Sequence, residues 1–302
     1  MSFSLGQGML DTFDQPHMQR SRGAALATFR LQRGQVRLAD LHQSGSGKIM
    51  FPRVGGPVPE VVFLNTSGGL TGGDRLNYTL EIGQGCRVLA TTQTAERGYA
   101  SLGTAAEVLV TAKVGSGGRL DWLPQETLLF EGANLTRRTA IDLAADAECL
   151  LAETIVLGRL AMGETLVAAE LLDHRMIRRQ GRPVWAESFH LNAAVLAQPS
   201  AALLAGARAM AVVCLVAQGA EDAMGPVRAV LDGSGAASGW DGKCVVRLVA
   251  ADGWPLKRQL GRILRVLTGR DLPRVWQDSV WQDGVWQSGG PADESWSNGE
   301  NT

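Results

Sequence analysis

Histidine, cysteine, lysine and tyrosine are all scarce in this chain of 302 residues. The four histidines are scattered and no HExxH or CxxC motif is present, so the sequence gives no ligand spacing typical of a zinc site. The four cysteines stand singly, three of them inside apolar runs, which indicates small buried side chains and not a disulfide framework.

The chain also lacks an excess of positive charge and a long apolar run. Its net charge is −1 and its pI about 6.4, which argues against nucleic acid and an anionic membrane as partners. The longest apolar run, AMAVVCLVA at 209–217, is too short to cross a bilayer, which takes about 20 residues. No secretory signal is evident at the N-terminus, so we expect a soluble, cytoplasmic protein.

Motifs for nucleotide binding and for hydrolysis are missing as well. SGSGKIM at 44–50 resembles a P-loop, but His42 stands where the first glycine belongs and Ile49 where the hydroxyl belongs. LNTSGGLTGGDRL at 64–76 has no lysine, and strand-like sequence follows Asp74 in place of a helix. There is no GxSxG elbow. The two glycine pairs therefore predict a tightly turned backbone and not a phosphate site.

The sequence is rich in short segments of aliphatic and β-branched residues separated by glycine-containing turns. This pattern predicts a mainly β fold, a solenoid-like or sandwich-like stack of short strands with a few helices toward the C-terminus. The expected strands cover residues 60–66, 75–82, 86–94, 106–114, 119–132, 136–144 and 148–158.

The chain divides into three parts by its composition and residue pattern. We expect a flexible tail at 1–19, a domain at 20–276 that is β-rich to about residue 190 and mixed afterwards, and a disordered extension at 277–302. The extension repeats the unit VWQ(D/S), which is consistent with a short adhesive motif. In the mixed part we expect a short helix from Pro199, a strand at 209–217, a helix interrupted or started by Pro226, a strand at 243–250 and an amphipathic helix from Pro255 to Gly269.

Two carboxylates occupy positions where apolar residues are expected. In ECLLAETIVLG both faces of the strand are apolar except around Glu153 and Thr154, so Glu153 should be buried. Glu126 shares a face with Trp122, Leu128 and Phe130. A buried carboxylate costs several kcal/mol unless it has partners. The residues alone leave two interpretations open: an internal salt bridge to arginine, or a hydrated passage whose oxygen ligands suit a divalent cation.

Several short motifs in a fixed order resemble the urease accessory protein family UreD, also called UreH. They are GGLTGGD at 68–74, TTQTAER at 91–97, WLPQE at 122–126, GANL followed by RRT at 132–139, the ETIVLG to AMGE stretch at 153–164, and LPRVW at 272–276. The resemblance spans about residues 20–276. It implies a compact β-rich scaffold that is not an enzyme and that binds apo-urease, UreF and UreG as part of a dimeric accessory complex. It also implies transient passage of Ni²⁺ toward urease, with no tightly bound cofactor.

The resemblance further implies roles for individual residues. The carboxylates proposed for a transient nickel passage are Asp74, Glu153, Glu164 and Glu187, with Thr91 and Glu126 as weaker candidates. The loop glycines Gly68, Gly69, Gly72 and Gly73 are expected to be structural and to turn Asp74 inward.

One departure from the family pattern and two alternatives remain. The chain has Arg97-Gly98-Tyr99 where relatives usually place an aliphatic or aromatic residue between the basic residue and the tyrosine, which leaves the local packing open. The protein could be a pure docking scaffold whose buried carboxylates are structural. Less consistent with the absent motifs is an enzyme that uses Asp74 and neighbouring carboxylates as acid and base.

Overall fold

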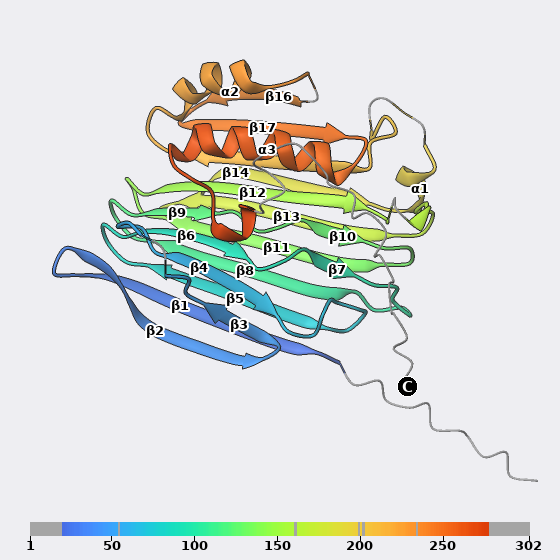
Figure 1. The fold of residues 1–302 in the computed structure, drawn as a ribbon, viewed down its shortest axis with the longest axis horizontal. Helices are drawn as coiled ribbons and strands as arrows, with labels where there is room; N and C mark the ends of the chain where they lie inside the picture. The colour runs from blue at the N-terminus through green and yellow to red at the C-terminus, as the bar shows by residue number, and fades with distance from the viewer. Residues whose placement is uncertain are drawn as a thin grey trace, which may run out of the picture.

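The computed structural model describes residues 20–277, apart from 54, 160, 161, 199, 201, 202 and 234. The tail predicted at 1–19 and nearly all of the extension predicted at 277–302 lie outside the described residues. Two β-sheets, here called sheet A and sheet B, stack face to face through most of the molecule (Figure 1).

Sheet A has seven strands in the order β14-β13-β11-β8-β5-β1-β2. Their bounds are β1 Arg22–Gln32, β2 Gln35–Gly45, β5 Arg75–Ile82, β8 Ala106–Val114, β11 Asn134–Leu143, β13 Glu170–Arg179 and β14 Arg182–Leu191. The central strands β1, β5, β8, β11 and β13 run parallel, and the hairpin partners β2 and β14 close the two edges in antiparallel pairing.

Sheet B has ten strands, eight of them in the order β16-β17-β15-β12-β9-β6-β4-β3, with β7 and β10 pairing beside β12. Their bounds are β3 Gly47–Met50, β4 Glu60–Asn65, β6 Arg87–Thr92, β7 Glu96–Gly98, β9 Arg119–Trp122, β10 Thr127–Leu129, β12 Glu148–Leu157, β15 Ala209–Val216, β16 Gly235–Trp240 and β17 Lys243–Ala250.

From β4 to β13 the chain alternates between the sheets, adding one parallel strand to each in turn. Parallel neighbours such as β5 and β8 in sheet A, or β4 and β6 in sheet B, are therefore joined through a strand of the other sheet, and among the described residues no α-helix lies between β4 and β13. Parallel sheets normally need helical crossovers, and here the second sheet provides the crossover. The prediction of a mainly β, solenoid-like stack with helices near the C-terminus is confirmed.

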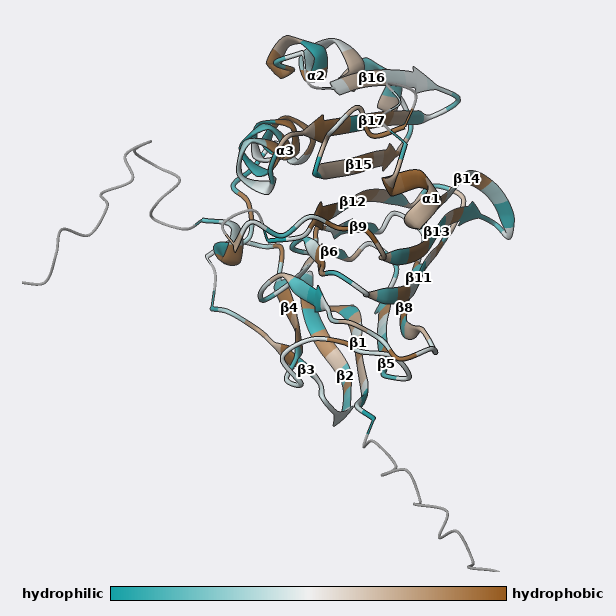
Figure 2. Ribbon diagram, turned by 90° about the vertical axis from the view of Figure 1, so that its right-hand side faces the viewer, coloured by the Kyte–Doolittle hydropathy of each residue, from teal (hydrophilic) through white to brown (hydrophobic). Residues whose placement is uncertain are grey.

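Sheet B is buried on both faces, whereas sheet A is buried on one. The first core fills the space between the sheets, and the second lies between sheet B and helix α3, Gly253–Thr268. Figure 2 shows α3 on one side of sheet B and the strands of sheet A on the other. On β12, Leu151 faces the first core and Leu150 the second, which explains why this strand is apolar on both faces.

The C-terminal elements follow most of the expected ranges. Helix α3 begins two residues before Pro255, because the Asp252 side chain accepts a hydrogen bond from the Gly253 N–H at 2.7 Å, and it is capped by Gly269 in a left-handed conformation. Helix α2, Met224–Val230, holds Pro226 in its first turn, where proline is tolerated, and follows the short 3₁₀ turn η2, Ala220–Ala223.

Two expectations for secondary structure are wrong. The segment 119–132 is not one strand, because the chain is irregular around Pro124 and divides into β9 and β10. The short helix α1, Ala193–Leu196, starts at the cap Asn192 and ends before Pro199, and the described residues from 203 to 206 form turns in place of the expected helix. No helix in the described part of the chain is long and apolar enough to cross a membrane.

Candidate functional site

A group of charged side chains lies between the two sheets, and we call it the inter-sheet ion cluster. Its members are Arg137 on β11, Glu153 on β12, and Asp173 and Arg175 on β13. All four are buried, with Glu153 2% and Asp173 0% exposed. The prediction that Glu153 is buried is therefore confirmed.

Strand register brings these residues together. Within sheet A, Arg137 is directly opposite Asp173 on the neighbouring strand, and Arg175 is directly opposite Glu187 on β14. Because side chains two residues apart on a strand share a face, Asp173 and Arg175 both point into the layer between the sheets. Glu153 points into the same layer from sheet B.

Both carboxylate oxygens of Glu153 accept hydrogen bonds. The Thr139 hydroxyl donates to Oε1 at 2.6 Å, and Arg175 Nε donates to Oε2 at 2.7 Å, with Arg137 Nη2 3.2 Å from Oε2. Burial alone would raise the pKa of Glu153, but the two guanidinium groups and the hydrogen bonds hold that pKa below its ordinary value. Glu153 is thus an ionised carboxylate with its partners in place.

Asp173 links the two arginines. It accepts from Nε of Arg137 at 3.1 Å and from the Nη2 atoms of both Arg137 and Arg175. Two guanidinium groups and two carboxylates leave the buried part of the cluster without net charge. Such balance is what allows ions to remain in an apolar layer, since an unpaired buried charge costs several kcal/mol.

The cluster reaches solvent through Glu187 and Arg247. Arg175 Nη1 donates to Glu187 at 3.3 Å, and Arg247 on β17 pairs with the other oxygen of Glu187. A pocket of about 200 Å³ opens here, with Glu153 and Arg175 in its wall together with the apolar side chains of Phe189 and Met210. Among the proposed nickel-passage residues, Glu153 and Glu187 are therefore brought together through one arginine.

Asp74 lies elsewhere, in the glycine loop. Its two oxygens accept from the backbone N–H groups of Ser21 at 2.7 Å and Thr71 at 2.9 Å, and the residue is 5% exposed. The expectation that the loop turns Asp74 inward is confirmed. Here the carboxylate fastens the loop to the start of β1.

The loop glycines explain how that turn is possible. Gly68, Gly69 and Gly73 have positive φ angles of 80°, 148° and 86°. A Cβ at Gly69 would lie 2.3 Å from the Tyr99 ring, and one at Gly72 would lie 2.2 Å from the Thr104 carbonyl oxygen. Glycine is therefore needed at three positions for a positive φ angle and at two because neighbouring atoms leave no room for a Cβ.

Glu164 forms a third, separate arrangement. It accepts from Nε and the N–H of Arg159, both at 2.9 Å, and from the N–H of Glu131 at 3.1 Å. These hydrogen bonds, with the Arg159 side chain contributing most, lower the pKa of Glu164 to about 2 against the opposing effect of burial.

The loops that carry Asp74 and Glu164 belong to one end of the stack. Backbone hydrogen bonds join successive loops there: Gly73 N–H to the Ala105 carbonyl at 3.0 Å, Ser101 N–H to Gly132 at 2.9 Å and Gly132 N–H to Ala168 at 2.7 Å. We call this the loop ladder. Asp74 and Glu164 both hold loops of this ladder, whereas Glu153 and Glu187 lie within strands.

The two weaker candidates have structural partners on the α3 side of sheet B. The Thr91 hydroxyl donates to the Leu123 carbonyl at 2.6 Å, and Glu126 pairs with Lys257 of α3 at 3.2 Å. Glu126 keeps 23% of its side chain exposed, so the expectation that it is buried like Glu153 is wrong. The physical reason is that Glu126 precedes the three-residue strand β10 and does not follow a continuous strand alternation.

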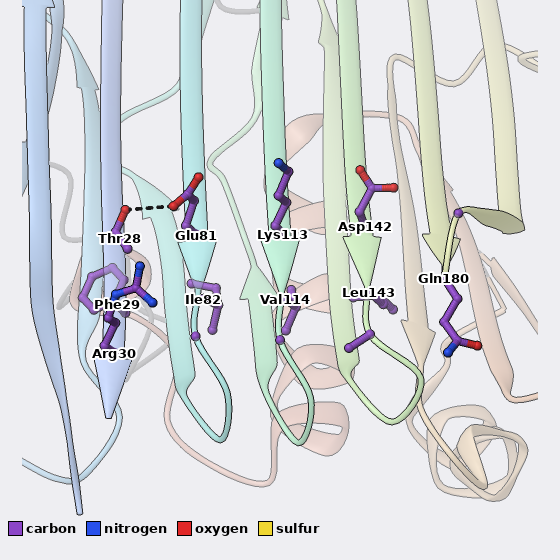
Figure 3. A pocket seen from close by; sticks show the side chains of 14 residues that line it. Thr28, Phe29, Arg30, Glu81, Ile82, Lys113, Val114, Asp142, Leu143 and Gln180 are labelled. Atoms are coloured by element: carbon purple, nitrogen blue, oxygen red, sulfur yellow. Dashed lines mark hydrogen bonds between the residues drawn. The ribbon is translucent and has the colours of Figure 1, made fainter. Parts of the chain in front are cut away.

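A larger pocket, about 590 Å³, contains none of the proposed site residues (Figure 3). It crosses the ends of several strands of sheet A. Figure 3 shows Thr28, Glu81, Lys113 and Asp142 in a row across neighbouring strands, with the Thr28 hydroxyl donating to Glu81 at 3.3 Å. Charges of alternating sign directly opposite one another are typical of cross-strand surface pairs, so we assign this pocket no chemistry.

Comparison with known proteins identifies the family. A family model described as UreD urease accessory protein matches residues 21–277. The chain belongs to the UreD family. The urease accessory protein UreD of Cereibacter sphaeroides (strain ATCC 17025) is 59% identical over 265 residues, which cover 86% of this chain and 96% of that protein. The corresponding protein of Paracoccus denitrificans is 50% identical over 273 residues (89% and 96%), and that of Jannaschia sp. 47% over 271 residues (89% and 100%).

The sequence motifs shared with the UreD family now have positions in space. GGLTGGD forms the first loop of the loop ladder, and AMGE ends at Glu164 in its last loop. At Arg97-Gly98-Tyr99, where the sequence departs from the family pattern, the residues pack closely against β10 and Phe130. Gly98 pairs with Leu129, whose side chain would lie 3.2 Å from an added Cβ, and Tyr99 packs edge-on against Phe130 with ring centroids 5.4 Å apart.

Sequence reasoning about this UreD family member missed the partners of Glu153. Arg137, Asp173 and Arg175 were not singled out, although Arg137 lies at every-second-residue spacing with Leu135, Thr139 and Ile141 and so shares the buried face of its strand. That spacing was the available signal. Within the described residues no group of three or more histidine, cysteine, aspartate and glutamate side chains is arranged to hold a metal ion.

Proposed function

We propose that this protein acts in urease maturation as a scaffold without catalytic activity of its own. In this role it binds apo-urease, UreF and UreG in the cytoplasm, within a dimeric accessory complex, and assists nickel insertion. The observation that carries the proposal is the UreD match along residues 21–277, together with relatives named urease accessory proteins over nearly their full lengths.

We further propose that nickel is cargo for this protein and no resident cofactor. Oxygen ligands suit an ion that must leave again, because they hold nickel less firmly than imidazole or thiolate does. Of the four carboxylates, Glu187 is best placed to meet an incoming ion. Its side chain is 19% exposed and borders the 200 Å³ pocket.

A second candidate function is a docking scaffold without a nickel route through this chain. The observation that favours it is the full engagement of Glu153, whose two oxygens already accept from Thr139 and Arg175. Asp74 and Glu164 likewise accept backbone N–H groups and hold loops in place. On this account the carboxylates stabilise the fold, and nickel reaches urease by another path.

Reconstituted urease activation separates the two functions. Apo-urease is incubated with UreF, UreG, GTP, Ni²⁺ and this protein, and three quantities are measured: complex formation, nickel bound to urease and urease activity. If nickel passes the pocket, Glu187→Gln lowers nickel loading severalfold while the complex still forms. Glu170→Gln, a carboxylate on β13 with 56% of its side chain exposed, is the matched control.

Two outcomes would count against the proposal. Normal nickel loading by Glu187→Gln, with the complex intact, would remove the pocket from the route and favour the docking scaffold. Failure of the unmodified protein to bind urease or the accessory proteins, or to change activation at all, would remove the maturation role itself.

A further inference from the structure

The last described residues of the chain are held in a defined site on the α3 side of sheet B. The short 3₁₀ turn η3, Arg274–Trp276, places the Trp276 ring in the second core, where the residue is 4% exposed. The indole Nε1–H donates to the Leu123 carbonyl at 3.0 Å and to the Thr91 hydroxyl at 3.3 Å. Lys257 Nζ lies 5.6 Å from the ring centroid, a cation–π distance.

The residues on either side of Trp276 are recognised as well. Gln125 Nε2 donates to the Val275 carbonyl at 3.2 Å, and the Val275 side chain packs against the second core. Gln277 Nε2 donates back to the Leu272 carbonyl. The contacts of this segment therefore involve the side chains of a valine, a tryptophan and a glutamine, in that order.

The same three residues recur twice in the sequence that follows. VWQD stands at 275–278 and again at 280–283, and VWQS stands at 285–288, so the copies are spaced by five residues. The second and third copies lie outside the described residues.

We propose that the site holding Trp276 is a binding site for a Val-Trp-Gln peptide, and that residues 280–282 of the same chain are its second ligand, entering when 275–277 leaves. The second copy offers the same indole N–H to Leu123 and Thr91, the same valine to Gln125 and the second core, and the same glutamine amide to the Leu272 carbonyl. Entry requires the connection after α3 to lengthen by five residues. Loop-closure entropy rises only slowly with length, so this change costs little.

The first copy is the preferred ligand because of the residues that precede it. The Arg274 N–H donates to both oxygens of the buried Glu60 carboxylate at 3.1 and 3.3 Å, and the positive charge of Arg274 favours that carboxylate. In the second copy Ser279 takes the place of Arg274, and Asp278 takes the place of Pro273. A second carboxylate near Glu60 is unfavourable, so this copy binds more weakly.

An intramolecular ligand also has an advantage over the tail of another molecule. A short flexible connection gives an effective concentration in the millimolar range, far above the concentration of a second chain in dilute solution. Residues 280–282 of the same chain are therefore the expected occupant. This inference is independent of urease, nickel and the accessory proteins.

The test compares thermal unfolding of full-length variants. Truncation of a buried tryptophan, when no other tryptophan fills the emptied site, should lower the unfolding midpoint by roughly 10 °C in a domain of this size. We expect that loss for Trp276→Ala/Trp281→Ala/Trp286→Ala, and less than half of it for Trp276→Ala alone. The matched control, Trp281→Ala/Trp286→Ala, should leave the midpoint unchanged because the first copy is intact. Equal midpoints for the single and triple variants would overturn the proposal.

A peptide experiment keeps the test decisive. The peptide Ser-Val-Trp-Gln-Asp-Gly, added in excess, should raise the midpoint of the triple variant, whereas the same peptide with alanine for tryptophan should not. If the triple alanine variant does not fold, the corresponding phenylalanine series is used, because phenylalanine keeps much of the packing but lacks the indole N–H. Absence of any peptide effect on a folded triple variant would also overturn the proposal.

Discussion

Arg175 joins the two sheets by donating from Nε to Glu153 at 2.7 Å. The two residues come from β13 of sheet A and β12 of sheet B, and both are almost fully buried. The contact therefore ties β13 of sheet A to β12 of sheet B inside the layer between the sheets.

Removing the charge of Glu153 should destabilise the protein strongly. In Glu153→Gln the two guanidinium groups keep only Asp173 as a buried counter-ion, and breaking a buried pair in this way typically costs about 3–5 kcal/mol. Urea unfolding measures the loss. Asp142→Asn is the control, since its pair with Arg178 spans 3.7 Å at the surface and should change stability by less than about 1 kcal/mol. Similar effects of the two substitutions would contradict a structural role for the cluster.

Gly69 and Gly68 should differ sharply in their tolerance of alanine. Gly68→Ala introduces a side chain at a φ of 80° with no heavy atom within 4 Å, which costs about 1 kcal/mol of backbone strain. Gly69→Ala places a Cβ 2.3 Å from the Tyr99 ring and 2.8 Å from the Arg97 carbonyl oxygen, so the loop must shift. We expect a loss of about 3 kcal/mol or more from the combined strain and clash. Equal losses in chemical denaturation would show that Tyr99 moves away freely.

Glu96 should make stability depend on pH near neutrality. Desolvation raises its pKa to about 7, although the Asn65 amide, the Arg97 N–H and the Arg97 charge act in the opposite direction. The folded state then holds a proton that the unfolded state, with a pKa near 4.5, has lost. The stabilisation is complete below pH 4.5 and disappears as the pH rises through 7.

The variant Glu96→Gln removes this titration. It should therefore be more stable than the unmodified protein at pH 8, by on the order of 2 kcal/mol, and the difference should shrink toward pH 5. Unfolding curves at several pH values measure it, with Glu107→Gln, an exposed carboxylate on β8, as control. A stability difference that does not change with pH would sink this prediction.

Glu164 should act in the opposite direction at acidic pH. Because its pKa is lowered to about 2, its contribution is present above the ordinary value of 4.5 and is lost as the pH falls toward 2. The amides of Glu131 and Arg159, which donate to this carboxylate, should lose protection against hydrogen exchange over that range. Glu164→Gln should show reduced protection at every pH, and unchanged protection in the variant would mean that the loop is held by other contacts.

The burial of Glu153 could be read from sequence because both faces of β12 are apolar around it. The same reasoning failed for Glu126, because it precedes a strand of only three residues, which is too short for an alternating pattern to predict burial. Helix α3 was recognisable from its amphipathic pattern and its terminal glycine. These are local features, and local sequence determines them.

The partners of Glu153 depend on long-range pairing and could not be located in this way. Arg137 meets Asp173 only because β11 and β13 pair in one particular register, and the two residues are 36 positions apart. An alternating pattern shows which face an arginine occupies, but the identity of the facing strand follows from the whole stack. For the same reason the sequence left open whether Glu153 is paired with arginine or lines a passage.

The contact between Trp276 and Thr91 spans 185 positions, and it bears on how the protein is made. Synthesis proceeds from the N-terminus. Leu89 and Leu123 on the α3 side of sheet B therefore stay uncovered until α3 and Trp276 have been synthesised, when almost the entire chain has emerged from the ribosome. A chain that ends between residues 191 and 253 contains every strand of sheet A but leaves this apolar face of sheet B uncovered. Such fragments should be bound by molecular chaperones or aggregate.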